Sequence, residues 1–214
     1  MTIFFTSDTH FHHVSILKYC NRPFASVEEM NEKLIANWNS VVTSKDVVYH
    51  MGDFSWGNAE KIRSVFDRLN GQKHLVLGNH DDIDSHKKLK WNWVKTEYTL
   101  KVNDLRYVLY HYPQRSWNYS VHGARHLFGH CHGTAKPWGY SFDVGTDCWD
   151  FTPVSIEVVE ATIAKMQRMN PEYDVAFMPK GVIWNGKTHD YSYRDFFVGD
   201  GSLDKVDPDA IRGE

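Results

Sequence analysis

The sequence predicts an α/β fold, and the order of elements in its first half is the main reason. Three short apolar runs, rich in β-branched and aromatic residues, alternate there with two amphipathic helical patterns. Such a β-α-β-α-β order is typical of parallel strands that are joined by crossover helices. The middle of the chain differs, because four strand-like runs follow one another across short polar or Gly-containing gaps. This part is predicted to be antiparallel or mixed.

Each element of the first half is predicted from the period of its apolar residues and from the residues that end it. Ser26 and Glu29 form a capping box ahead of the first helix. Gly71 stands where a left-handed cap would end the second helix. In order, the predicted elements are a strand at 2–7, a helix at 27–42, a strand at 46–50, a helix at 58–70 and a strand at 73–77.

The second half is predicted from turn signals between shorter runs. Asn103 and Asp104 favour a hairpin turn, and Pro153 favours a helix start with Thr152 as its N-cap. In order, the predicted elements are strands at 93–102, 105–112, 125–130 and 140–146 and a helix at 153–168. We therefore expect a main domain over residues 1–170. The C-terminal extension, 171–214, is predicted to hold a hairpin (181–184 and 191–198) and a frayed acidic tail.

The composition bears on whether the chain binds nucleic acid or a membrane and on where it is located. The chain has 214 residues and a formal net charge of -3, which is no electrostatic reason for tight nucleic-acid binding, although a local basic groove stays open. No apolar run approaches the ~20 residues of a membrane span, so no membrane partner is expected. The 3 cysteines are unpatterned, which favours reduced thiols and a cytoplasmic location. The oligomeric state is left open.

Five polar clusters, each at the end of an apolar run, are the most informative feature of the chain. Because the carboxyl ends of parallel strands lie at one edge of a sheet, we expect the clusters to meet there. Carboxylate, imidazole and amide groups together suit two divalent metal ions. The clusters are Asp8-Thr9-His10, Gly52-Asp53, Gly78-Asn79-His80-Asp81, His111 and Gly129-His130-Cys131-His132.

The spacing within two clusters adds a second argument. In an extended chain, residues i and i+2 point to the same face. Asp8 with His10, and His130 with His132, are therefore predicted to point into one cavity, with Cys131 pointing away. Taken alone, each cluster has an ordinary reading as a turn, a cap or a polar loop. Their combination at successive strand ends favours a metal site.

Together the clusters resemble the calcineurin-like metallophosphoesterase superfamily, and above all its small bacterial and phage members. Their opening motif resembles Ser7-Asp8-Thr9-His10-Phe11-x-His13, and the resemblance covers roughly residues 2 to 160. It implies two mixed β-sheets packed face to face and flanked by helices, which is a four-layer sandwich within the α/β class. It also implies a metal-dependent phosphoesterase, that is, a hydrolase of the phosphodiesterase or phosphatase type.

The resemblance also implies a role for each residue of the clusters. A hydroxide between two metal ions would attack phosphorus, with His80 as the catalytic histidine. The preferred ion is manganese, with iron, zinc, nickel and magnesium as alternatives. The ligands would be Asp8, His10, Asp53 and His132 for one ion, and Asp53, Asn79, His111 and His130 for the other, so that Asp53 bridges them.

The chain departs from the superfamily's protein phosphatases at one point. Those proteins continue Gly-Asp with two residues and then Asp-Arg-Gly, whereas here Asp53 is followed by Phe54-Ser55-Trp56-Gly57. Trp56 therefore stands where a carboxylate would orient the catalytic histidine. This disfavours protein-phosphatase activity. Asp81, Asp82 or a backbone carbonyl remain alternatives for orienting His80.

Four further residues are candidates for substrate contacts. An arginine can clamp a phosphate and a tryptophan can stack on a ring, against an equally weighted reading as surface or packed residues. They are His13, Arg22, Arg115 and Trp117. We expect a small phosphorylated substrate, with a nucleotide-like phosphodiester preferred and a phosphomonoesterase or a nuclease as alternatives. A non-catalytic binding scaffold is disfavoured, because no ligand position of the pattern is vacant.

Overall fold

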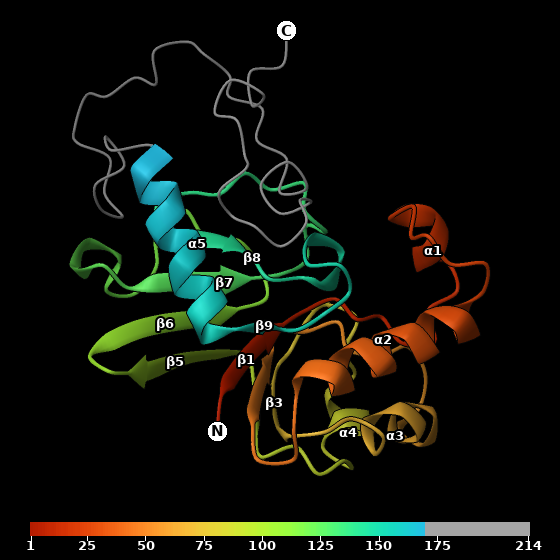
Figure 1. The fold of residues 1–214 in the computed structure, drawn as a ribbon. Helices are drawn as coiled ribbons and strands as arrows, with labels where there is room; N and C mark the ends of the chain where they lie inside the picture. Colours follow the sequence, from red (N-terminus) through yellow and green to blue (C-terminus); the bar gives the residue numbers. More distant parts are fainter. Residues whose placement is uncertain (170–214) are drawn as a thin grey trace, which may run out of the picture.

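The computed structural model describes residues 1–169 and contains two mixed β-sheets (Figure 1). The first sheet has the order β4-β3-β2-β1-β9. Its strands are β1 (Ile3–Thr6), β2 (Val47–His50), β3 (Gln72–Val76), β4 (Val94–Lys95) and β9 (Val154–Ser155). Neighbouring strands from β4 to β1 are parallel, and β9 is antiparallel to β1. The parallel part confirms the order predicted for the first half of the chain.

The second sheet has the order β5-β6-β7-β8. Its strands are β5 (Glu97–Val102), β6 (Leu105–Tyr110), β7 (Arg125–Phe128) and β8 (Ser141–Asp143). The β5–β6 pair is an antiparallel hairpin, whereas β6, β7 and β8 are parallel. The prediction of a mixed sheet is therefore confirmed.

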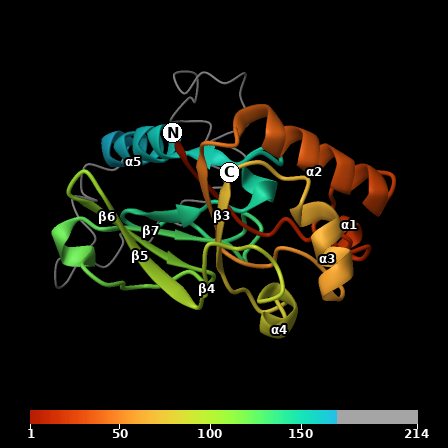
Figure 2. The same cartoon turned by 90° about the horizontal axis from the view of Figure 1, so that it is seen from below.

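The helices lie on both sides of the paired sheets. The α-helices are α1 (Ile16–Tyr19), α2 (Val27–Val41), α3 (Ala59–Phe66), α4 (Ile83–His86) and α5 (Ile156–Met169), with 3-10 turns η1 (Ser120–His122) and η2 (Thr146–Cys148). Figure 2 shows α2 and α3 on one side of β3 and the second sheet with α5 on the other. Among the described residues, no helix is both long and apolar enough to cross a membrane.

Alternation along the strands of the first sheet builds the two cores. Successive side chains of a strand face opposite sides. One core lies between the sheets, and the Phe5 ring of β1 stacks there on Tyr107 of β6 at 5.9 Å. The other core lies under α2 and α3. The alternating pairs are Phe4 and Phe5, Val48 and Tyr49, and Leu75 and Val76, of which the first of each pair faces the helices.

Helix α5 is tied to the second sheet by one charged residue. Glu160 accepts hydrogen bonds from the Tyr107 hydroxyl of β6 at 2.8 Å and from the Arg125 guanidinium of β7 at 2.9 and 2.6 Å. The start of α5 differs from the prediction. Val154 and Ser155 pair with β1 before the helix begins at Ile156, so sheet pairing delays the helix. The Thr152 hydroxyl donates to the Asp150 carbonyl instead of capping the helix.

Two predicted strands also differ from the structure. The run at 93–102 is divided, because Val94 pairs with β3 in the first sheet while Glu97 pairs with β6 in the second. This strand passes between the sheets, which a single-strand prediction does not contain. The run at 140–146 keeps only Ser141–Asp143 as β8. The hairpin and tail predicted for 171–214 lie outside the described residues.

Candidate metal centre

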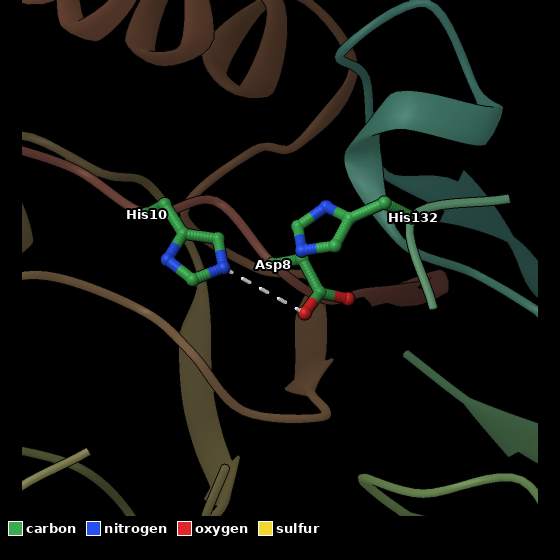
Figure 3. A group of neighbouring side chains, drawn as sticks. All are labelled: Asp8, His10 and His132. Atoms are coloured by element: carbon green, nitrogen blue, oxygen red, sulfur yellow. Dashed lines mark ion pairs between the residues drawn. The ribbon is translucent and has the colours of Figure 1, made fainter. Parts of the chain in front are cut away.

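The strand ends bring one set of predicted ligands together (Figure 3). Asp8 and His10 follow β1, and His132 follows β7. One ligand atom from each lies within 4.8 Å of the others. His10 Nε2 is 3.9 Å from Asp8 Oδ1, and the His10 and His132 rings stack with centroids 5.2 Å apart. Asp8 and His10 thus face one small volume together with His132, which is distant from them in sequence.

A second set gathers beside the first. Asp53 follows β2, His111 follows β6 and His130 follows β7, and their ligand atoms again lie within 4.8 Å of one another. Asn79, after β3, places its Oδ1 3.0 Å from His111 Nε2. His130 and His132, which are separated only by Cys131, therefore belong to different sets.

Asp53 lies between the two sets. Its Oδ2 is 3.5 Å from His10 Nε2 and 3.5 Å from His111 Nε2. Its other oxygen, Oδ1, accepts the backbone N–H of His80 at 2.9 Å. One carboxylate oxygen is therefore held by the backbone, while the other faces both groups of histidines.

The backbone conformation predicted for Asp8–His10 and His130–His132 is wrong. The spacing argument assumed extended chain at Asp8–His10 and His130–His132. Instead, Asp8, His10, His130 and His132 all have positive φ, between 48° and 68°, and so does Asp53 at 55°. A left-handed backbone at a residue other than glycine costs roughly 1–2 kcal/mol, so the fold concentrates strain where these side chains converge.

Two glycines allow the loops to approach. A Cβ at Gly78 would collide with the Asp53 carboxylate and backbone, and one at Gly129 would collide with Ser7 and Asp8. Any larger residue would therefore push the loop of His130 away from Asp8. The short Gly-containing motifs keep the strand ends in contact.

Two of the candidate ligand histidines are oriented by their second ring nitrogens. His111 Nδ1 lies 2.7 Å from the Met51 carbonyl oxygen, which fixes Nδ1 as the donor and turns Nε2 toward Asp53. His132 Nδ1 lies 2.7 Å from Asp147 Oδ2, so its Nε2 faces Asp8 (Figure 3). Such outer partners are typical of metal-binding histidines.

The electrostatics of the first set favour a positive charge between its side chains. Burial raises the pKa of Asp8 well above its usual range, and His132 opposes that rise. Burial lowers the pKa of His10, so its ring is neutral and keeps a free lone pair. Burial also opposes the charge on His132, but Asp147 and Asp8 raise its pKa to about 11. The carboxylates that favour a proton there equally favour a divalent cation.

His80 is exposed at the edge of the site. Its ring lies 5.5 Å from the His10 ring, 5.8 Å from His13 and 5.6 Å from Trp56, between centroids. Its backbone N–H is bound to Asp53. The imidazole is therefore next to the ligands, with other rings as its neighbours.

The two carboxylates proposed to orient His80 have other partners. Asp81 accepts the backbone N–H groups of Asp53, Phe54 and Gly78 at 2.8, 2.9 and 2.9 Å. Asp82 caps α4 by accepting the N–H of Ser85 at 3.0 Å. The oxygens of Asp81 are therefore occupied by the backbone, while Asp82 and a backbone carbonyl stay predictions for the group that orients His80.

Arg22 is not available to a substrate, which corrects the prediction. Its side chain is fully buried and pairs bidentately with Asp147, at 2.8 and 2.7 Å. Its remaining N–H groups donate to the carbonyls of Asp8 at 2.6 Å and Thr9 at 3.0 Å. Arg22 therefore holds the loop that carries Asp8 and His10, because all of its donors face the protein.

The other predicted substrate contacts divide into three cases. Trp117 is a core residue, since it is buried between the sheet residues and its indole N–H donates to the Ala124 carbonyl at 2.7 Å. The prediction for Trp117 is therefore wrong. Arg115 is exposed and lies over the Trp138 ring at 5.8 Å. His13 is half-buried beside the site, with its Nδ1 3.2 Å from His10 Nδ1.

Two functional carboxylates were missed in the sequence. Asp147 orients His132 and pairs with Arg22. Asp143, at the end of β8, accepts the N–H of Gly133 at 3.0 Å and of Gly145 at 2.7 Å, and so fixes the loop after His132. Asp143 is the last residue of β8 and Asp147 lies in η2 just beyond it, but the strand predicted at 140–146 hid this strand end in the sequence.

The donor set fits divalent metal ions. His10 Nε2 is buried and has no hydrogen-bond partner, yet it faces two carboxylates. A buried polar atom without a partner is costly unless a ligand satisfies it. Oxygen and imidazole donors without thiolate suit ions such as manganese, iron or zinc.

Comparisons with known proteins find relatives that match most of this chain. An uncharacterized protein of Methanocaldococcus jannaschii is 36% identical over 172 residues, which are 76% of this chain and 92% of that protein. The Gene 66 protein of Mycobacterium phage D29 is 28% identical over 188 residues, 71% of this chain and 92% of that protein. A protein of unknown function from Aquifex aeolicus shares the fold, with a TM-score of 0.64, 22% identity and coverage of 75% of this chain and 98% of that chain.

The match to a family model covers most of the described residues. Residues 1–162 match the model described as calcineurin-like phosphoesterase, and this region contains both ligand sets. Members of this family use divalent metal ions. The chain therefore belongs to the calcineurin-like phosphoesterases and is a metal-dependent phosphoesterase.

Proposed function

We propose that the chain hydrolyses a phosphodiester of small, nucleotide-like size with two divalent cations. The observation that carries the proposal is the position of Asp53, whose Oδ2 is 3.5 Å from the Nε2 atoms of both His10 and His111. A carboxylate that faces two ligand sets suits two metal ions at the close spacing of a two-metal site. The ligands would be Asp8, His10, Asp53 and His132 for one ion and Asp53, Asn79, His111 and His130 for the other.

The cations supply one part of the chemistry when bound: they acidify a water molecule and neutralise charge on the phosphoryl oxygens. The chain supplies the geometry. The left-handed backbone at Asp8 and Asp53 aims both carboxylates into the site, and Asp147 and the Met51 carbonyl fix His132 and His111. Little reorganisation is then needed during the reaction.

His80 would act on the leaving oxygen. It is exposed, and its ring borders His10 at 5.5 Å. From there its imidazole can donate a hydrogen bond or a proton to the oxygen that departs from phosphorus. Its backbone attachment to Asp53 keeps it at a constant position relative to the ligands.

The preference for a diester rests on Arg22. A monoester carries more negative charge than a diester, so it gains more from an arginine clamp. The guanidinium of Arg22 is bound by Asp147 and by two backbone carbonyls, so it has no donor left for a phosphate.

Manganese is the ion that we propose. A cytoplasmic location agrees with the free thiols of Cys20, Cys131 and Cys148.

The direct test is turnover of bis-p-nitrophenyl phosphate and p-nitrophenyl phosphate with added manganese. We expect faster turnover of the diester, and its loss in Asp53→Asn, because that change weakens both ligand sets. Turnover that is absent with manganese, iron, zinc, nickel and magnesium would contradict the proposal. A faster reaction with the monoester would instead support the phosphomonoesterase alternative.

A further inference from the structure

Trp56 presents a large aromatic surface beside the candidate metal centre. It is 47% exposed, although most tryptophan surface in folded proteins is buried. Its indole stacks on the His13 ring, with centroids 4.7 Å apart and an interplanar angle of 12°. One face of the indole is thus supported by a parallel ring, while about half of the residue remains open.

The loop holds Trp56 in place. The backbone N–H of Trp56 donates to the Phe11 carbonyl at 2.8 Å, and the Ser55 hydroxyl donates to the same carbonyl at 3.2 Å. The chain then turns at Gly57, whose φ is +115°. The indole is therefore presented by an anchored backbone, so its position is largely formed before a ligand arrives.

The indole is connected to the site through two histidines. His13 reaches His10 with ring centroids 5.2 Å apart. His80 lies between, 5.6 Å from the indole and 5.5 Å from the His10 ring. A phosphorus at the ligand sets with its leaving oxygen toward His80 would therefore direct the rest of that leaving group toward Trp56.

We propose that Trp56 is a binding surface for a planar ring of the substrate, a nucleobase or an aryl group, which stacks on the indole while the phosphate lies at the metal centre. This inference rests on the proposed function, whose site it extends. It replaces Trp117, which is buried in the core, as the stacking residue. Trp56 and His13 then determine specificity, because stacking accepts any flat ring and offers nothing to an aliphatic group.

Equilibrium binding tests the inference without any need for turnover. The dissociation constants of AMP, phenyl phosphate and ribose 5-phosphate are measured by calorimetry on the manganese-loaded full chain. Ribose 5-phosphate has the phosphate and the sugar of AMP but no ring, so the ratio of the two constants isolates the base. We expect AMP to bind roughly tenfold or more tightly than ribose 5-phosphate. A gain with phenyl phosphate would identify a ring attached directly to the ester oxygen.

Three variants complete the test. Trp56→Leu should reduce the AMP preference at least about fivefold, and Trp56→Phe should retain most of it, because a ring remains. Tyr119→Leu is the control, since Tyr119 is similarly exposed, at 42%, but packs on Arg106, at the opposite end of β6 from His111.

The outcomes separate this inference from the proposed function. An AMP preference that is the same in Trp56→Leu and in the unchanged chain would overturn the role of Trp56, even if turnover is normal. An equal loss of affinity for both ligands would overturn it as well, because it would show damage to the phosphate site. Absence of turnover with intact, Trp56-dependent ring binding would contradict the proposed function alone.

Discussion

The Asp81 carboxylate accepts the backbone N–H of Asp53 at 2.8 Å. The same group accepts the N–H of Phe54 and of Gly78, and its Oδ1 lies 3.1 Å from the buried His86 Nε2. The loops after β2 and β3 are therefore joined beside Asp53 by one side chain. Asp81 belongs to the predicted Gly78-Asn79-His80-Asp81 cluster, and in the structure it holds the backbone of Asp53.

Asp81→Asn should weaken metal binding roughly 10–100-fold. An amide has only one oxygen acceptor, so its NH₂ group would face a backbone N–H and displace Asp53. Manganese titration measures the effect. Asp82→Asn is the matched control, because the exposed Asp82 caps α4 and accepts no hydrogen bond from the loop of Asp53. Equal metal affinity in the Asp81 variant and the unchanged chain would show that the clamp is not needed.

Arg22→Met should cost about 3 kcal/mol or more of unfolding free energy, since it removes the arginine partner of the buried Asp147 and the donors to the carbonyls of Asp8 and Thr9. Denaturant unfolding measures the loss. Arg68→Met is the control: it also breaks a bidentate pair, with Glu32, but an exposed one, so it should cost below about 1 kcal/mol. Similar losses in both variants would argue against a structural role for Arg22.

Acid should destabilise the fold through His126. Burial lowers the pKa of this histidine from 6.5 to about 4, against its hydrogen bonds to the backbone of Val108 and Tyr112. Between these values the unfolded chain binds a proton and the folded chain does not. Stability is therefore complete above pH ~6.5 and falls as the pH decreases toward ~4, by up to roughly 3 kcal/mol.

His126→Gln removes this titration. The difference in unfolding free energy between the unchanged chain and the variant should shrink as the pH falls through this range. A difference that does not change with pH would show that His126 is not the responsible group.

The site was predictable wherever sequence position alone decides the geometry. Asp8, Asp53 and Asn79 follow parallel neighbouring strands, so their meeting follows from topology. Their backbone conformation could not be predicted from the sequence, because the left-handed φ of Asp8 and His10 is imposed by packing around the loop. Sequence periodicity contains no information on such strained residues.

Long-range pairing explains the remaining errors. Arg22 finds Asp147 across 125 residues of sequence, and only the folded chain reveals that its charge is already used. Trp117 carries no local sign of burial, yet it packs on His126 between strands. Val154 and Ser155 were predicted to begin a helix, but in the fold they pair with the edge of β1. Helices of four residues, such as α1, are too short for periodicity to detect.

His80→Ala should lower kcat on the order of 100-fold while metal content stays the same. The side chain of His80 borders the ligands by ring contacts, whereas its attachment to Asp53 is through the backbone and survives the change. Steady-state kinetics and metal analysis are measured on the same preparation. His122→Ala, in the exposed turn η1, is the control. Loss of metal together with activity would make His80 a ligand.

The number of manganese ions bound per chain tests most directly whether Asp53 joins two metal sites. At saturation, equilibrium dialysis should find two ions in the unchanged chain. His130→Ala, which alters only the set of Asp53, His111 and His130, should retain one of them, and Asp53→Asn should bind both weakly. One ion in the unchanged chain, or two tightly bound ions in Asp53→Asn, would contradict the account.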